Sequence, residues 1–121
     1  MRNTLCGAVA LGLAVISGPA MADETWNNGV LFTQQELAPV VGHTAFKIVF
    51  GLEPGKCTDE ITTVSEWLIM REGTLTQTYP GKGAIERVPG KDWFHPAGTK
   101  VVVCNKSDKK AVLEGVQFRP K

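Results

Sequence analysis

Apolar and polar residues alternate along much of the chain. In residues 45–52, Phe46, Ile48, Phe50 and Leu52 occupy every second position, so they share one face of an extended segment. Residues 58–64 are rich in Thr, Ile and Val, which favour strands. This period of two predicts half-buried β-strands.

Strand-like segments and turn residues follow one another from residue 30 onwards. The further predicted strands span residues 30–37, 66–70, 74–79, 84–88, 101–104 and 111–118. Gly and Pro residues separate them about every eight to twelve residues, a spacing typical of an all-β sandwich or barrel. A tight turn at Gly73 predicts that residues 66–70 and 74–79 form a hairpin.

The first 22 residues have a different pattern. Arg2 gives a positive start, residues 5–16 form an uncharged apolar run, and residues 20–22 read small-x-small. This order is typical of a secretory signal peptide that is cleaved before Asp23, and it predicts a periplasmic or secreted protein. The apolar run is shorter than the roughly 20 residues that cross a bilayer, so we expect no membrane attachment after cleavage.

No repeat or linker divides the rest of the chain. We expect an N-terminal arm and edge strand over residues 23–42 and one β-domain over residues 43–121. Arg2 is one of the 13 Lys and Arg residues, so 12 remain after cleavage against 12 Asp and Glu. Since these charges balance and form no basic cluster, we expect no nucleic-acid partner.

Two cysteines, Cys57 and Cys104, remain after cleavage. The oxidising compartment that a signal peptide implies favours a disulfide between them. Two separate buried thiols are the alternative.

Residues 90–105 contain the most specific spacing in the chain. Gly90, Pro96, Gly98, Val101 and Asn105 follow the order Gly-x5-Pro-x-Gly-x2-Val-x3-Asn. This order resembles the second motif of the cupin family at every position but one. The family has a metal-binding His where this chain has Val101.

The spacing Glu66-x6-Gly73 is similar to the end of the first cupin motif. The two His residues of that motif would fall on Glu60 and Thr62, or on Asp59 and Ile61 if the gap is longer. The resemblance covers about residues 46–118. It implies a single all-β domain after the signal peptide, a cupin-like jelly-roll barrel or sandwich.

The resemblance also bears on the two cysteines. In cupins the strand of the first-motif His residues lies antiparallel beside the strand of the second-motif His. If Glu60 faces Val101, then Cys57 faces Cys104 with Cβ atoms about 4.5–5.5 Å apart. The resemblance therefore implies a Cys57–Cys104 disulfide.

Members of the family hold Fe, Mn, Ni or Zn with three His and one Glu. This chain keeps only the carboxylate, Glu66, so the resemblance implies neither the ordinary metal site nor a cofactor. His95, next to Pro96, leaves two placements open. It lies either inside the barrel beside Glu66 or at the rim, bonded to a carbonyl or water.

We therefore predict a secreted cupin-like domain that binds an unidentified small molecule or partner in its barrel. The expected ligand-binding residues are Thr62, Glu66, Trp93, His95 and Val101. One alternative is a metal-independent isomerase, epimerase or lyase with Glu66 and His95 as catalytic candidates. Another is an unusual metal site from Glu60, Glu66 and His95. By resemblance we expect a homodimer, with Trp67 on the outer face because it alternates with Glu66.

Overall fold

The computed structural model describes residues 24–121, which form β-strands and loops. This part of the chain has no helix long and apolar enough to cross a membrane. The predicted signal peptide lies outside the described residues. The strands are β2 (Trp26–Asn27), β3 (Val30–Val40), β4 (His43–Leu52), β5 (Ile61–Thr62), β6 (Ser65–Glu72), β7 (Leu75–Tyr79), β8 (Gly83–Arg87), β9 (Asp92–His95), β10 (Lys100–Cys104) and β11 (Ala111–Pro120).

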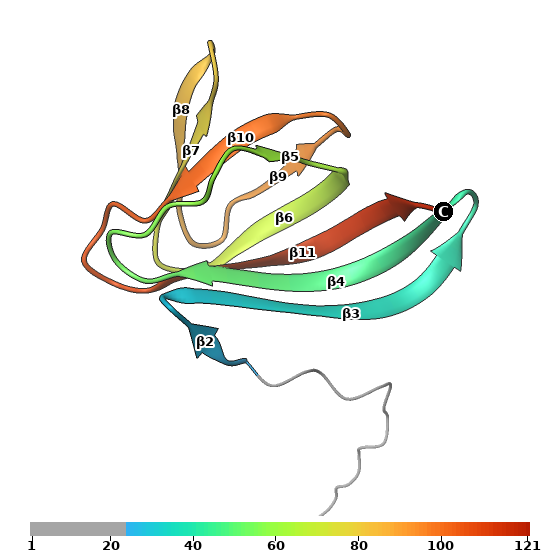
Figure 1. Ribbon diagram of the computed structural model, residues 1–121, viewed down its shortest axis with the longest axis horizontal. Helices are drawn as coiled ribbons and strands as arrows, with labels where there is room; N and C mark the ends of the chain where they lie inside the picture. Colours follow the sequence, from blue (N-terminus) through green and yellow to red (C-terminus); the bar gives the residue numbers. More distant parts are fainter. Residues whose placement is uncertain (1–23) are drawn as a thin grey trace, which may run out of the picture.

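The strands form two sheets that pack face to face (Figure 1). The larger sheet has the order β2-β3-β4-β11-β6-β9, and the smaller has the order β5-β10-β7-β8. Neighbouring strands are antiparallel throughout both sheets. The prediction of an all-β sandwich is confirmed.

The main core lies between the sheets. It is formed by alternate residues of the strands, the pattern that the sequence shows most clearly in β4. The buried members are Ile48, Leu52, Leu68, Met70, Leu75, Val101, Val103, Ala111 and Leu113. Because both sheets contribute, the space between them is enclosed by apolar side chains.

A smaller cluster covers part of the opposite face of the larger sheet. Leu31, Val49 and Val112 are buried there, and Trp26 packs against them. The Arg71 guanidinium donates two hydrogen bonds to the Glu24 carboxylate, at 2.7 and 2.9 Å. These contacts fix the start of the described chain on the outside of the sandwich.

The predicted hairpin of residues 66–70 and 74–79 is wrong. β6 pairs with β11 and β9, whereas β7 pairs with β10 and β8, so the two strands belong to different sheets. The chain crosses at Gly73, whose φ of 71° favours glycine. A Cβ at this position would collide with the Lys110 carbonyl and with Ala111. The turn was predicted correctly, but it joins two layers.

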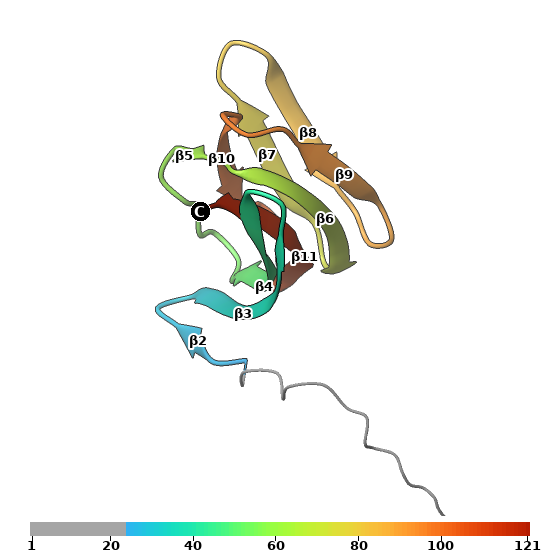
Figure 2. The same cartoon turned by 90° about the vertical axis from the view of Figure 1, so that its right-hand side faces the viewer.

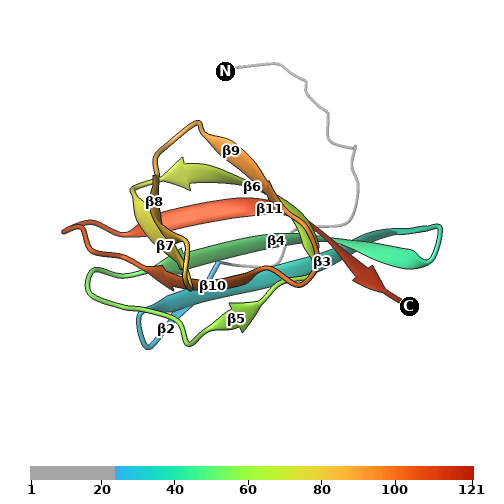
Figure 3. The same ribbon diagram turned by 90° about the horizontal axis from the view of Figure 1, so that it is seen from above.

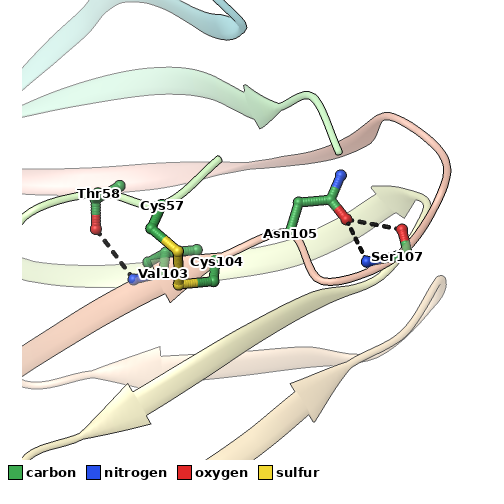
Figure 4. Close-up of a disulfide and its surroundings, with 6 residues drawn as sticks. All are labelled: Cys57, Thr58, Val103, Cys104, Asn105 and Ser107. Carbon is green, nitrogen blue, oxygen red and sulfur yellow. Dashed lines mark hydrogen bonds between the residues drawn. A yellow bond between two sulfur atoms is a disulfide. The ribbon is translucent and has the colours of Figure 1, made fainter. Parts of the chain in front are cut away.

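Cys57 and Cys104 form a disulfide with an S–S distance of 2.08 Å (Figure 4). The pairing of Cys57 with Cys104 was predicted from a register in which Val101 faces Glu60. In the structure Val101 faces Ile61, so that register is wrong by one residue at β5. The loop between Cys57 and β5 absorbs the difference. There the Val103 amide donates to the Thr58 hydroxyl, and the Thr58 amide donates to the Val103 carbonyl.

The two sheets differ in length. The β3–β4 hairpin and the end of β11 reach beyond the smaller sheet (Figures 1 and 3). β9 is an edge strand of the larger sheet and β8 is an edge strand of the smaller sheet. These two edges lie on the same side of the molecule (Figure 2). Arg87 bridges them there, since its guanidinium lies 4.4 Å from the ring centre of Trp93.

Candidate functional site

A cavity of about 310 Å³ lies between the two sheets. Its lining is mostly apolar, and both sheets contribute to it. The residues are Phe32, Ile48, Phe50, Ile61, Thr62, Thr63, Val64, Glu66, Leu68, Gln77, Val101, Val103, Leu113 and Gln117. Phe32 and Ile61 are 50% and 38% exposed, so they lie where the cavity meets solvent.

Glu66 is the charged residue of this lining. It points inward from β6 while its neighbour Trp67 is exposed, as the alternation predicts. The carboxylate accepts hydrogen bonds from two side chains. Gln117 Nε2 lies 2.9 Å from Oε1, and His95 Nδ1 lies 2.8 Å from Oε2. A carboxylate only accepts, so Nδ1 carries the hydrogen.

His95 connects Glu66 to the smaller sheet. The ring is buried, and its Nε2 lies 2.7 Å from the Tyr79 hydroxyl. β9 places His95 directly opposite Glu66 on β6. Of the two placements that the sequence left open, the structure has the one inside the barrel. His95 therefore links the Glu66 carboxylate to the Tyr79 phenol within one hydrogen-bonded series.

Gln77 continues this network on β7. Its Oε1 accepts from Arg87 Nε and from the Tyr79 hydroxyl, both at 2.9 Å. Arg87 also donates to the Tyr79 oxygen at 2.7 Å. Arg87 thus fixes the side-chain oxygen of Gln77. Gln77 is only 1% exposed and lines the cavity.

On β11, in the larger sheet, Arg119 fixes the side-chain oxygen of Gln117 in the same way. Its Oε1 accepts from Arg119 Nε at 3.1 Å and from Arg119 Nη2 at 2.9 Å. Arg119 also donates to Gln34 at 2.8 Å and lies 4.0 Å from the ring centre of Phe46. One hydrogen-bonded network therefore runs from Arg87 through His95 and Glu66 to Arg119.

The predicted ligand-binding residues fall into two groups. Thr62, Glu66 and Val101 line the cavity. His95 and Trp93 are not part of its lining: His95 lies behind Glu66, and Trp93 packs against the core. Trp93 Nε1 is buried without a hydrogen-bond partner among the described residues. The assignment of a ligand to any of these residues stays a prediction.

The residues of the cavity do not fit the metal that cupins hold. Within residues 24–121, no three His, Cys, Asp or Glu side chains lie close enough together to share an ion. The alternative site from Glu60, Glu66 and His95 is therefore wrong. Glu60 is exposed in the loop before β5, whereas the other two are buried.

Sequence reasoning missed the two glutamines of the site. Gln77 and Gln117 each occupy an inward-facing position of a strand, where an apolar residue is usual. Polar residues at such positions need internal hydrogen-bond partners. The period of two could have marked both residues, but it could not have identified their arginine partners.

Comparison with known proteins gives a likeness in structure only. No family model and no curated protein matches the chain. Among solved structures, the Cupin_2 domain of an XRE-family transcriptional regulator from Enterobacter cloacae is 16% identical, with a TM-score of 0.61. The match covers 78% of this chain and 100% of that domain.

Two further neighbours have the same TM-score of 0.61. A cupin superfamily protein from Desulfitobacterium hafniense is 17% identical, with 80% of this chain and 84% of that protein covered. The polyketide cyclase RemF from Streptomyces resistomycificus is 18% identical, with 78% and 69% covered. The resemblance of the two sequence motifs is thus supported by the structure, and the described part of the chain has the cupin fold.

Proposed function

We propose that this protein binds a small molecule with an apolar body in the cavity between its two sheets. The observation that carries the proposal is a largely apolar cavity with one buried polar network at its wall. Cavities of this composition are typical of small-molecule sites, where a few polar groups orient the ligand. Val101 replaces a metal ligand of the family with an apolar contact.

A titration with propylbenzene tests this binding. Val101 and Val103 face the cavity, so Val102 between them faces the opposite side of β10. We expect the wild-type protein to bind one propylbenzene, Val101→Phe to lose at least about tenfold in affinity because the ring fills the cavity, and Val102→Phe to bind as wild type. Equal binding by Val101→Phe would contradict the proposal. So would a wild-type protein that binds neither propylbenzene nor its hydroxylated analogue 4-propylphenol.

We propose that the protein acts outside the cytoplasm, in the periplasm or medium. The signal-like pattern of residues 1–22 and the Cys57–Cys104 disulfide support this location. N-terminal sequencing of the protein from its own host is expected to begin at Asp23. A chain that keeps Met1 in a cytoplasmic fraction would contradict it.

A second candidate function is acid–base catalysis without a metal. The arrangement that favours it is the hydrogen-bonded series Glu66–His95–Tyr79, which places a proton-transfer group at the cavity wall. Two structural neighbours are described as a sugar phosphate isomerase and a polyketide cyclase. If the molecule retained by the native protein exchanges carbon-bound hydrogen in D₂O with wild type but not with Glu66→Gln, catalysis is supported. No exchange with wild type leaves binding alone.

A further inference from the structure

The polar wall of the cavity has one amide donor without a partner. Arg87 can only donate hydrogen bonds, so the Gln77 atom that faces it must be the carbonyl oxygen. That oxygen already accepts two hydrogen bonds. The Gln77 amide nitrogen makes no hydrogen bond to the described part of the chain. Since Gln77 is almost fully buried and lines the cavity, its NH₂ group is left for a ligand.

Arg119 fixes the amide of Gln117 by the same logic. Its two donors occupy the Gln117 oxygen, so the NH₂ group faces Glu66. One of the two amide hydrogens is used by Glu66. The other is free to reach a ligand, because Gln117 also lines the cavity.

Glu66 supplies the matching acceptor. A carboxylate has about four lone-pair directions, and the two hydrogen bonds from His95 and Gln117 use half of them. The other lone-pair directions of Glu66 can accept hydrogen bonds from a ligand, because Glu66 is buried and lines the cavity. The wall therefore offers a strong acceptor and amide donors within one network.

We propose that the cavity selects an uncharged ligand whose apolar body ends in a hydroxyl group. In this arrangement the hydroxyl donates to Glu66 and accepts from the amide of Gln77, both of which line the cavity. A ligand carboxylate would lie against the Glu66 carboxylate, which is the charged group of the lining. The apolar remainder of the cavity disfavours a charge of either sign away from Glu66. This inference rests on the proposed binding function and adds the ligand's chemical class.

Three matched probes test the class on the wild-type protein, by calorimetric titration. They are 4-propylphenol, its methyl ether 4-propylanisole, and 4-propylbenzoate. We expect the phenol to bind at least about tenfold more tightly than the ether, because a hydrogen bond to a charged acceptor is strong. The benzoate is expected to bind most weakly.

The outcomes separate the class from the binding function. If the ether or the benzoate binds as tightly as the phenol, the hydroxyl class is wrong although the cavity still takes up ligands. If neither propylbenzene nor any of the three probes binds, the binding function fails, and this inference fails with it.

The variant Glu66→Gln tests whether Glu66 causes the preference for the phenol over the ether. In Glu66→Gln we expect the phenol to lose about tenfold in affinity while the ether keeps its affinity, which also shows that the cavity is intact. The control Glu72→Gln lies on the same strand with an exposed side chain and should change neither. Gln77→Met removes the amide donor and should also reduce the preference. An unchanged phenol preference in folded Glu66→Gln overturns the assignment, and if that variant does not fold, the wild-type probe series decides.

Discussion

Asn105 shows how one buried side chain closes a strand and orders the loop that follows. Its Nδ2 donates to the carbonyls of Leu52 and Lys109, and its Oδ1 accepts from the amide and hydroxyl of Ser107 (Figure 4). Asn105 is the last residue of the second motif spacing, and its side chain satisfies backbone groups of neighbouring segments. An Asn directly after an apolar strand is a candidate for this role, because its side-chain oxygen accepts and its NH₂ group donates hydrogen bonds.

Replacement of Asn105 by Ala should destabilise the protein strongly. The substitution leaves buried backbone groups without partners, at about 1–3 kcal/mol for each group. We expect the free energy of unfolding, measured by urea denaturation, to fall by about 3 kcal/mol. The control Asn27→Ala, at an exposed position of β2, should change it by less than about 0.5 kcal/mol. A similar loss in both variants would contradict this account.

Glu24 gives a pH-dependent contribution to stability. Its hydrogen bonds with Arg71 hold the pKa of the carboxyl below the ordinary value of 4.5. The contribution is therefore complete above that value and is lost as the pH falls through the lowered pKa. Since the pair is partly exposed, it is worth less than about 1 kcal/mol.

Urea denaturation of Glu24→Gln at two pH values checks this pair. At neutral pH the variant should be less stable than wild type by under about 1 kcal/mol, and well below pH 4.5 the difference should vanish. The control Glu60→Gln, at another exposed position, should show no such change with pH. A difference that grows on acidification would be the wrong sign.

The strands themselves were more predictable than their partners. Alternation located most of β4, and strand-like segments between turn residues located most of β6, β7, β10 and β11. These patterns did not reveal that β6 and β7 lie in different sheets. A glycine turn reverses the chain in either case, and the pairing of β6 and β7 with different strands is what distinguishes a crossing from a hairpin.

The disulfide joins the loop before β5 to the end of β10, across 47 residues of sequence. Cross-linking a loop of this length stabilises a protein by about 4 kcal/mol by the chain-entropy relation, which is model-dependent. We expect the double variant Cys57→Ser and Cys104→Ser to lose about 2–4 kcal/mol in urea denaturation. Wild type with a reductant should lose a similar amount, and a reductant should leave the double variant unchanged. Equal stability of all these forms would contradict a structural role.

At the scale of the whole molecule, the sequence predicted the sandwich and three residues of the cavity lining, Thr62, Glu66 and Val101, but not the hydrogen-bonded network. Glu66 was recognisable from motif spacing, and His95 was left between two placements. The hydrogen-bonded network could not be predicted from the sequence, because Gln77 and Gln117 come from different sheets. Gln77 is bonded to Arg87 of the neighbouring strand, and Gln117 to Arg119 of its own strand. The cavity depends on side-chain volumes from both sheets, which no single strand specifies.

We expect the protein to form a homodimer through the outer face of the larger sheet. Trp67 and Phe94 are cross-strand neighbours there and are 40% and 55% exposed. Aromatic residues exposed together are typical of an interface. In sedimentation experiments wild type should be a dimer and Trp67→Glu a monomer, whereas Ile85→Glu, on the smaller sheet, should remain a dimer. A wild-type monomer at all concentrations would contradict this expectation.

The central claim is that a chain with the cupin fold, without the histidines that hold a metal in the cupin family, uses its cavity to hold a small molecule. Native mass spectrometry of the protein purified from its own host, without a metal-binding tag, tests this most directly. We predict that the folded chain carries one organic molecule, which is released on unfolding and is absent from Val101→Phe. A chain that instead carries one transition-metal ion would contradict the account.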